Sequence, residues 1–468
     1  MFELSCVLVI LVSGGAGVSA FLATRDPLHP AVFVSPLFAY FYGLWPLVLN
    51  RDGQLEGVLH ESYLQHASSI FLVTIAAMFV GMLHGVRRLR DAPSAALNPF
   101  GDLLTPTMSR RLARLALFMG SLSVVAFYLQ LDNVGGFVSA YSHGKGGGRA
   151  ESGIIGEAIL LSFPALLALA LSVYADGRRV TWGHVTMALF IVSPHLVQGI
   201  LGGRRGPLFL VLTTLLFSWL IAKGKRPSLS AIVMSVCVIG FAVIFIASQR
   251  DRIYIGSQES FDYSRVFQGD GLAPEAIDAG NSFVTAISNI VAADFYDDHY
   301  WGYRYFVTFF IRPIPKEIWP TKYEDMGAEW LELYGTGSEA ARYTNSIGFA
   351  LPGGVSGGSI ADGYVEFSWG VTLMFFVIGR VFAASYVRHR LEGGFWSIIF
   401  FTMLALSIYL PTQSFSAWML RLLFMSGFAY LFWRAAIGPV SHIPGDNDPR
   451  PGSSPGRELR RSNPKGTS

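Results

Sequence analysis

Long apolar stretches alternate with short polar ones along most of the chain. A helix needs about 20 consecutive apolar residues to cross the hydrocarbon core of a bilayer. About eleven stretches come close to or meet that length: 2–23, 30–49, 67–86, 112–131, 154–175, 184–202, 207–222, 229–248, 360–386, 395–410 and 417–436. The pattern predicts an all-α polytopic membrane protein, with eight spans within 1–249 and three within 360–437. The stretch 207–222 is the shortest and leaves a re-entrant segment open.

The polar connections predict the orientation of the chain. Basic residues mark five of them: 87–114, 178–179, 223–226, 388–390 and the tail 438–468. Counting the spans in order places all five on one side, which the positive-inside rule makes cytoplasmic. The N-terminus is then outside and the C-terminus inside. The tail is rich in Pro, Gly and Ser, which predicts disorder.

One connection on the outer side is much longer than the others. Residues 250–359 span roughly 110 positions, far beyond the usual helix connection. We expect a large, partly helical periplasmic loop. Within it, Ile287, Ile290 and Val291 are spaced for one face of a helix predicted over 278–294. The aromatic stretch 301–311 is typical of a membrane–water interface.

The composition excludes several classes of protein. Charged residues make up 14% and hydrophobic residues 52% of the 468 positions, whereas soluble chains carry about 25% charged residues. A soluble enzyme, a nucleic-acid binder and a disordered scaffold are excluded. The two cysteines lie inside apolar runs, and no Cys, His or carboxylate group has metal-ligand spacing. No metal site is predicted.

Two adjacent arginines break the charge rule. Arg204 and Arg205 lie in a Gly-Gly-Arg-Arg-Gly-Pro turn between two predicted spans, on the outer side. Guanidinium groups bind phosphate oxygens bidentately, and the helix that follows offers its N-terminal amides to the same anion. The turn is therefore a candidate pyrophosphate site. The alternative is that both arginines cap the preceding helix and contact lipid phosphates.

The long loop supplies a second set of cations. Arg250 and Arg252 directly follow the preceding span, at the start of the loop. In its later part, Arg312, Lys316 and Lys322 are interleaved with Trp319 and three prolines. The prolines exclude a regular helix there. The composition suits a site that binds phosphate through the cations and a sugar ring on the aromatic face. A membrane-surface segment anchored by the tryptophan is an equal alternative.

A third cluster opens the span after the loop. A glycine-rich segment at 353–358 precedes Asp362 and Glu366, which are four residues apart and share one helical face. Carboxylates are costly in lipid and face protein or water. Either one is a candidate general base. The alternatives are a helix-dipole role for Asp362 and a structural role for Glu366.

These features resemble those of bacterial O-antigen and exopolysaccharide repeat-unit polymerases of the Wzy type. The resemblance rests on the large late outer loop, the Gly-Arg-Arg-Gly-Pro turn at 203–207, the Pro-Lys-x-Ile-Trp-Pro-x-Lys stretch at 315–322 and the glycine-rich entry to the next span. Family members commonly have Arg where this chain has Lys316, and Pro where it has Tyr323. Arg342 and Gly353 also fit an Arg-x10-Gly pattern described for the family.

The resemblance implies a membrane glycosyltransferase of the C type in the bacterial inner membrane. Such an enzyme transfers glycan from a polyprenyl-pyrophosphate-linked oligosaccharide to an incoming repeat unit, without metal, nucleotide sugar or other cofactor. Arg204, Arg205 and the five loop cations would hold the pyrophosphate, and Trp319 and Tyr364 would stack on sugars. A chain-length regulator and a flippase are implied partners. An O-antigen ligase and a flippase for lipid-linked oligosaccharides remain as alternatives.

Overall fold

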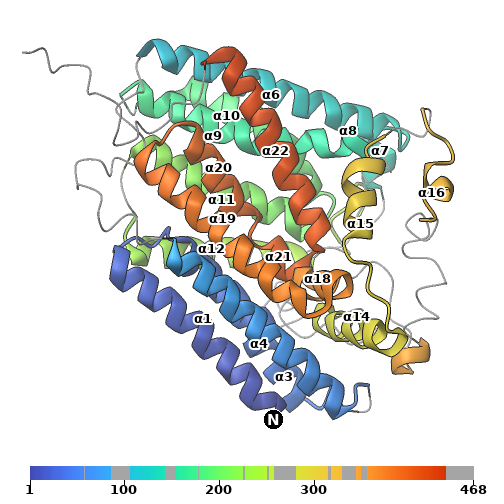
Figure 1. Ribbon diagram of the computed structural model, residues 1–468. Coiled ribbons are helices and arrows are strands. Elements are labelled where there is room, and N and C mark those ends of the chain that lie inside the picture. The colour runs from blue at the N-terminus through green and yellow to red at the C-terminus, as the bar shows by residue number, and fades with distance from the viewer. Residues whose placement is uncertain are drawn as a thin grey trace, which may run out of the picture.

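The computed structural model describes residues 1–56, 58–85, 106–142, 153–177, 179–224, 227–249, 252–257, 281–314, 318–328, 344–348 and 356–438. The predicted tail, the helix start at 278–280 and much of the long loop lie outside these segments. Within them every regular element is a helix (Figure 1).

The helices before the long loop form most of the bundle. In chain order they are α1 (Phe2–Thr24), α2 (Pro30–Ala39), the π-helix η1 (Tyr40–Leu44), α3 (Trp45–Arg51), α4 (Glu61–His84), α6 (Pro106–Asp132), α7 (Gly136–Tyr141), α8 (Gly153–Ala158), the 3₁₀ turn η3 (Ile159–Leu161), α9 (Ser162–Ala175), α10 (Trp182–Ile200), α11 (Arg205–Lys223) and α12 (Leu229–Ser248).

The remaining helices belong to the long loop and to the C-terminal spans. They are α14 (Ser282–Tyr296), α15 (Tyr303–Phe306), the π-helix η5 (Val307–Ile311), α16 (Lys322–Asp325), α18 (Gly358–Phe367), the 3₁₀ turn η7 (Ser368–Gly370), α19 (Val371–Leu391), α20 (Phe395–Leu406), α21 (Tyr409–Thr412) and α22 (Phe415–Ala436). The predicted loop helix at 278–294 corresponds to α14, and its three predicted apolar residues are buried.

Ten helical segments of the described chain are long and apolar enough to cross a membrane. They correspond to ten of the eleven predicted spans. The stretch 207–222, for which a re-entrant segment was left open, belongs to the continuous 19-residue helix α11. The eleventh stretch forms α12, whose apolar part in the described residues covers 229–242.

The span predicted at 360–386 is not one continuous helix. It is divided into α18 and α19 by the turn η7, at whose start Ser368 has φ 50° and ψ −136°. Hydropathy alone does not detect such a break, because the apolar composition continues across it. The break makes α18 a separate short helix that packs on α14, α21 and α22.

Close helix contact at the centre of the bundle depends on glycine. A Cβ atom at Gly379 of α19 would lie 2.1 Å from the Met78 carbonyl oxygen of α4, and one at Gly81 would lie 2.3 Å from the Phe376 carbonyl oxygen. Membrane helices associate through such small residues, because lipid offers no hydrophobic driving force between helices. The α4–α19 pair is therefore fixed by backbone proximity.

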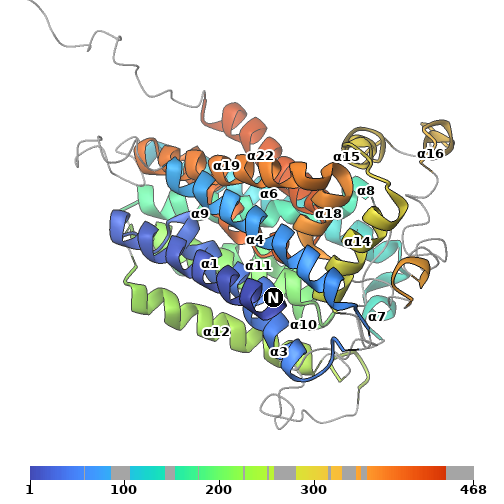
Figure 2. The same ribbon diagram turned by 60° about the horizontal axis from the view of Figure 1, so that its bottom comes forward.

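The loop helices gather at one end of the bundle, which we call the loop end. Both views show α7, α14, α15 and α18 there, and α1 begins on the same side (Figures 1 and 2). At the opposite end, Asp26 of the α1–α2 turn accepts hydrogen bonds from Tyr386 and Arg390 of α19, and all three are buried.

Candidate functional site at the loop end of the bundle

Glycines allow α18 to start deep among its neighbours. A Cβ atom at Gly357 would lie 2.8 Å from the Ala286 Cα of α14. Gly358 has φ 79°, and a Cβ there would lie 2.6 Å from both the Pro411 carbonyl oxygen and the Tyr42 hydroxyl. The end of the glycine-rich segment predicted from the sequence therefore serves close packing and a left-handed backbone.

The two predicted carboxylates of α18 share one buried arginine. Arg304 of α15 donates from Nε to Glu366 Oε1 and from Nη2 to Asp362 Oδ1, the latter at 2.8 Å. Glu366 has 0% exposure, and Asp362 and Arg304 are also buried. The sequence predicted each carboxylate as a candidate base. The structure places both in an ion pair that anchors the loop to α18.

Asp362 and Glu366 also accept hydrogen bonds from other segments. Asp362 Oδ2 accepts from the Tyr305 hydroxyl at 2.9 Å and from the Phe415 N–H at 3.0 Å. Burial and the charge of Asp362 raise the pKa of Tyr305 well above its ordinary value. Glu366 Oε2 accepts from the Gly302 N–H at 2.9 Å. The buried carboxylates thus tie α15 and the start of α22 to α18.

The turn that precedes α15 is held in an unusual conformation. The Trp301 N–H donates to the Glu366 carbonyl oxygen at 2.7 Å, and the Tyr300 N–H donates to the Val365 carbonyl oxygen at 3.2 Å. Trp301 has φ 51°, a region that bulky residues rarely adopt. Its indole is 72% exposed. The buried ion pair therefore holds an exposed tryptophan on a strained backbone.

The basic turn between α10 and α11 also lies at the loop end. Arg204 occupies the N-cap position of α11, and Arg205 is the first residue of this helix and is exposed. Burial raises the pKa of Tyr141 in α7 to about 12, while the charge of Arg204 lowers it, so this guanidinium acts on that hydroxyl. The Ile255 N–H donates a hydrogen bond to the Tyr141 carbonyl oxygen at 2.8 Å, and this bond fixes the end of α7 in place.

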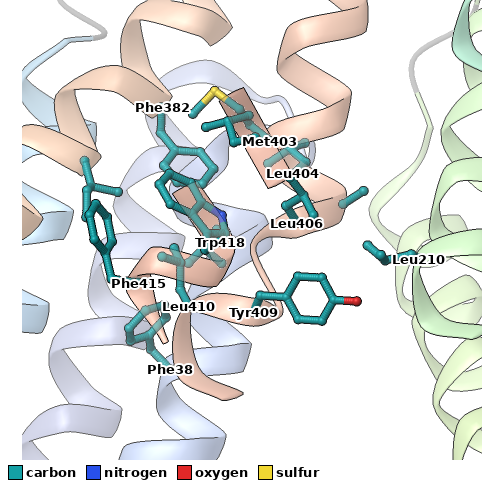
Figure 3. Close-up of a cluster of buried hydrophobic side chains, with 14 of the residues drawn as sticks. Phe38, Leu210, Phe382, Met403, Leu404, Leu406, Tyr409, Leu410, Phe415 and Trp418 are labelled. Atoms are coloured by element: carbon teal, nitrogen blue, oxygen red, sulfur yellow. The ribbon is translucent and has the colours of Figure 1, made fainter. Parts of the chain in front are cut away.

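A buried tyrosine joins this turn to the last helix. A Cβ atom at Gly206 would lie 3.0 Å from the Tyr409 hydroxyl, and the Arg421 guanidinium lies 4.5 Å from the centre of the Tyr409 ring. Figure 3 shows the Tyr409 ring pointing away from Trp418 and Phe415 toward α11. Arg421 Nε lies 4.0 Å from Glu157 Oε2, and its buried Nη1 has no hydrogen-bond partner. The sequence prediction missed Arg421.

The other predicted cations have different surroundings. Lys322 is buried, and its ammonium donates to the carbonyl oxygens of Ile311, Arg312 and Ile314. It holds the segment after η5, whereas Arg312 itself is exposed. Arg252 lies in the described piece 252–257 and is partly buried. Arg250 and Lys316 lie outside the described residues.

The two predicted sugar-binding aromatics are both hydrogen-bonded. Trp319 Nε1 donates to Asp325 Oδ2 at 2.6 Å. This bond, with a second from Thr321, lowers the pKa of the exposed Asp325 carboxyl. Tyr364 is buried, and its hydroxyl donates to Asp294 Oδ1 at 2.8 Å. Stacking of a sugar on either ring remains a prediction.

A histidine and an aspartate missed from the sequence meet beside Tyr364. His66 Nε2 of α4 lies 3.0 Å from Asp294 Oδ2 of α14, with side chains 41% and 37% exposed. His66 also packs edge-on against the rings of Tyr364 and Trp369. The two residues lie 228 positions apart, so only the fold brings them together. A polar residue near the outer end of a predicted span was the one available signal.

The described residues hold no group of three or more His, Cys, Asp or Glu side chains that could hold a metal ion. The fold and its ten apolar helices define a multi-pass helical membrane protein, with buried ion pairs and exposed cations at its loop end. No family model matches the chain, and no curated protein or solved structure is similar enough to count as a match.

Proposed function

We propose that this protein is a membrane glycosyltransferase that polymerises lipid-linked oligosaccharide repeat units. It transfers the growing glycan from polyprenyl pyrophosphate to an incoming repeat unit at the periplasmic face of the inner membrane. The observation that carries the proposal is the approach of two basic segments to Tyr409, the Arg204–Arg205 turn through Gly206 and α22 through Arg421, at the end of the bundle where the long loop lies.

This convergence suits a pyrophosphate leaving group. Negative charge develops on the phosphate oxygen as the sugar–oxygen bond breaks, and preorganised cations lower the energy of that state. Arg204 and Arg205 stand at the N-terminus of the 19-residue helix α11, whose dipole favours the same charge. Arg421 approaches from α22 with a buried Nη1 that has no hydrogen-bond partner. The polyprenyl tail would lie in the bilayer beside the spans.

The proposal is tested by chain length. The chromosomal gene is replaced by variants, and the surface polysaccharide of the cells is resolved on a gel after the membrane level of each variant has been measured. We expect Arg204→Gln, Arg205→Gln and Arg421→Gln to shorten or remove the polymer ladder. The matched control is Arg434→Gln, because Arg434 lies on the same helix as Arg421, is exposed and donates a hydrogen bond to the Tyr430 hydroxyl one turn away.

Three outcomes separate the candidate functions. Loss of the ladder with single repeat units remaining supports polymerisation. Loss of all polysaccharide from the lipid A core, with polymer retained on the lipid carrier, would identify a ligase instead. Wild-type ladders in all three arginine variants, at wild-type membrane levels, would overturn the proposed pyrophosphate site.

A further inference from the structure

We propose that His66 and Asp294 form a catalytic dyad that takes the proton from the acceptor hydroxyl, and that Trp301 and Trp369 flank the acceptor sugar. This inference rests on the proposed function, because it assigns the acceptor side of the same transfer. The arginine turn serves the leaving group, and this dyad serves the nucleophile.

The geometry of His66 suits a general base. Its Nε2 lies 3.0 Å from Asp294 Oδ2, so the ring donates this N–H to the carboxylate and carries its lone pair on Nδ1. The Tyr364 hydroxyl donates to the other carboxylate oxygen at 2.8 Å and fixes the orientation of Asp294. Because the histidine side chain is 41% exposed, a substrate hydroxyl can reach it.

Two exposed tryptophans lie near this dyad. The centre of the Trp369 ring lies 6.3 Å from that of His66, and the Trp301 ring lies 6.2 Å from that of His299. Both histidines pack edge-on against Tyr364. Trp369 is 45% exposed and Trp301 is 72% exposed, so a ligand can contact both indoles. Flat aromatic faces beside a few polar groups are typical of small-molecule sites.

Backbone strain is concentrated around the same cluster. Four non-glycine residues of the described chain have positive φ, and three of them flank it: Asp297 after Asp294, Trp301 itself, and Ser368 before Trp369. Such conformations are unfavourable for residues other than glycine and cluster at functional sites. The buried Arg304–Glu366 pair holds the turn at Trp301 through the Gly302 N–H.

The proposed step balances without a further reactant. His66 Nδ1 accepts the proton of the acceptor hydroxyl as its oxygen forms a bond to the anomeric carbon of the donor. The bond between that carbon and the phosphate oxygen breaks, and its electron pair leaves with the lipid pyrophosphate. The Asp294 carboxylate stabilises the imidazolium, which then releases the proton to water.

The carboxylate has its own role in the proposed step. Asp294 from α14 and Tyr364 from α18 lie against His66, and His299 lies beyond the tyrosine ring. Asp294→Asn keeps a hydrogen-bond acceptor for the ring but removes the negative charge that stabilises the imidazolium. We therefore expect Asp294→Asn to lower the rate of polymerisation as well.

The test measures initial polymerisation rates in membranes supplied with the lipid-linked repeat unit of the source strain. His66→Gln keeps an N–H donor for Asp294 but cannot accept a proton. We expect it to lower the rate about a hundredfold or more, the usual contribution of a general base, with thermal stability and membrane level unchanged. His84→Gln is the matched control, because His84 is exposed at the other end of the same helix.

The outcomes distinguish this inference from the proposed function. If wild-type membranes make no polymer from the lipid-linked unit, the proposed function fails. If they make polymer and His66→Gln is as fast as His84→Gln, the dyad is overturned while polymerisation stands. A rate for Asp294→Asn equal to that of the wild type would also overturn it, since a purely structural pair predicts that result.

Discussion

Removing Arg304 tests how much the loop end depends on its buried ion pair. In Arg304→Met the side-chain volume is largely kept, but the hydrogen bonds to Glu366 Oε1 and Asp362 Oδ1 and a third to the Asp362 carbonyl oxygen are lost. Removing one partner of a buried pair leaves uncompensated charge and costs about 3–5 kcal/mol. We expect the free energy of unfolding to fall by this amount.

The loss of Arg304 affects the two carboxylates unequally. Without Arg304, Asp362 still accepts from the Tyr305 hydroxyl and the Phe415 N–H. Within the described residues, the Glu366 carboxylate keeps only the Gly302 N–H as a donor, and the side chain has no exposure. Adding Glu366→Gln to Arg304→Met should therefore restore more stability than adding Asp362→Asn.

Reversible unfolding in mixed micelles, followed by tryptophan fluorescence, would give the four free energies of each double-mutant cycle. Arg312→Met is the control, because Arg312 is exposed on the adjacent turn. The reasoning is refuted if Arg304→Met is as stable as Arg312→Met. Equal recovery by both second substitutions would refute the claim that Glu366 is the less compensated group.

Three further predictions follow from other contacts. Gly379→Leu should separate α4 from α19 and cost at least the 1–3 kcal/mol typical of overpacking, whereas Gly427→Leu, with nothing within 4 Å, should leave the melting temperature unchanged. Lys322→Met removes donors to three carbonyl oxygens, so chymotrypsin should cleave the surrounding segment faster. Hydrogen bonds lower the pKa of Asp325 below 3.8 in the folded state, so they stabilise its turn above pH 3.8 and lose that effect as the pH falls through the lowered pKa. Trp319→Phe removes one of these hydrogen bonds, so proteolysis of the turn should depend less on pH in this range.

The sequence predicted the membrane-spanning helices well because hydropathy is a local property. Each apolar stretch predicts a helix from its own composition, without reference to the rest of the chain. Even α14 was detectable from three apolar residues on one face. The break between α18 and α19 was not detectable, since it depends on the Ser368 backbone and on neighbours that pack against α18. Local composition does not predict such contacts.

The functional residues were predictable only as types, and their partners were not. Asp362 and Glu366 stood out as carboxylates in an apolar span, but Arg304, which pairs with both, lies 58 and 62 residues earlier in an aromatic stretch. Arg421 and His66 were missed for the same reason. Arg421 lies inside a predicted span and His66 directly before one, so each looks like an isolated polar residue, and its role depends on α21 or α14.

The buried pair and the exposed dyad are mechanically connected through one turn. Glu366 binds the Gly302 N–H with its carboxylate and the Trp301 N–H with its carbonyl oxygen. Two residues before it on α18, Tyr364 holds Asp294. A change at Arg304 should therefore move both Trp301 and the carboxylate that orients His66. We expect Arg304→Lys, which keeps the charge but cannot bond both carboxylates in the same way, to slow polymerisation more than it lowers the membrane level of the protein. If rate and membrane level fall in proportion, the pair acts through folding alone.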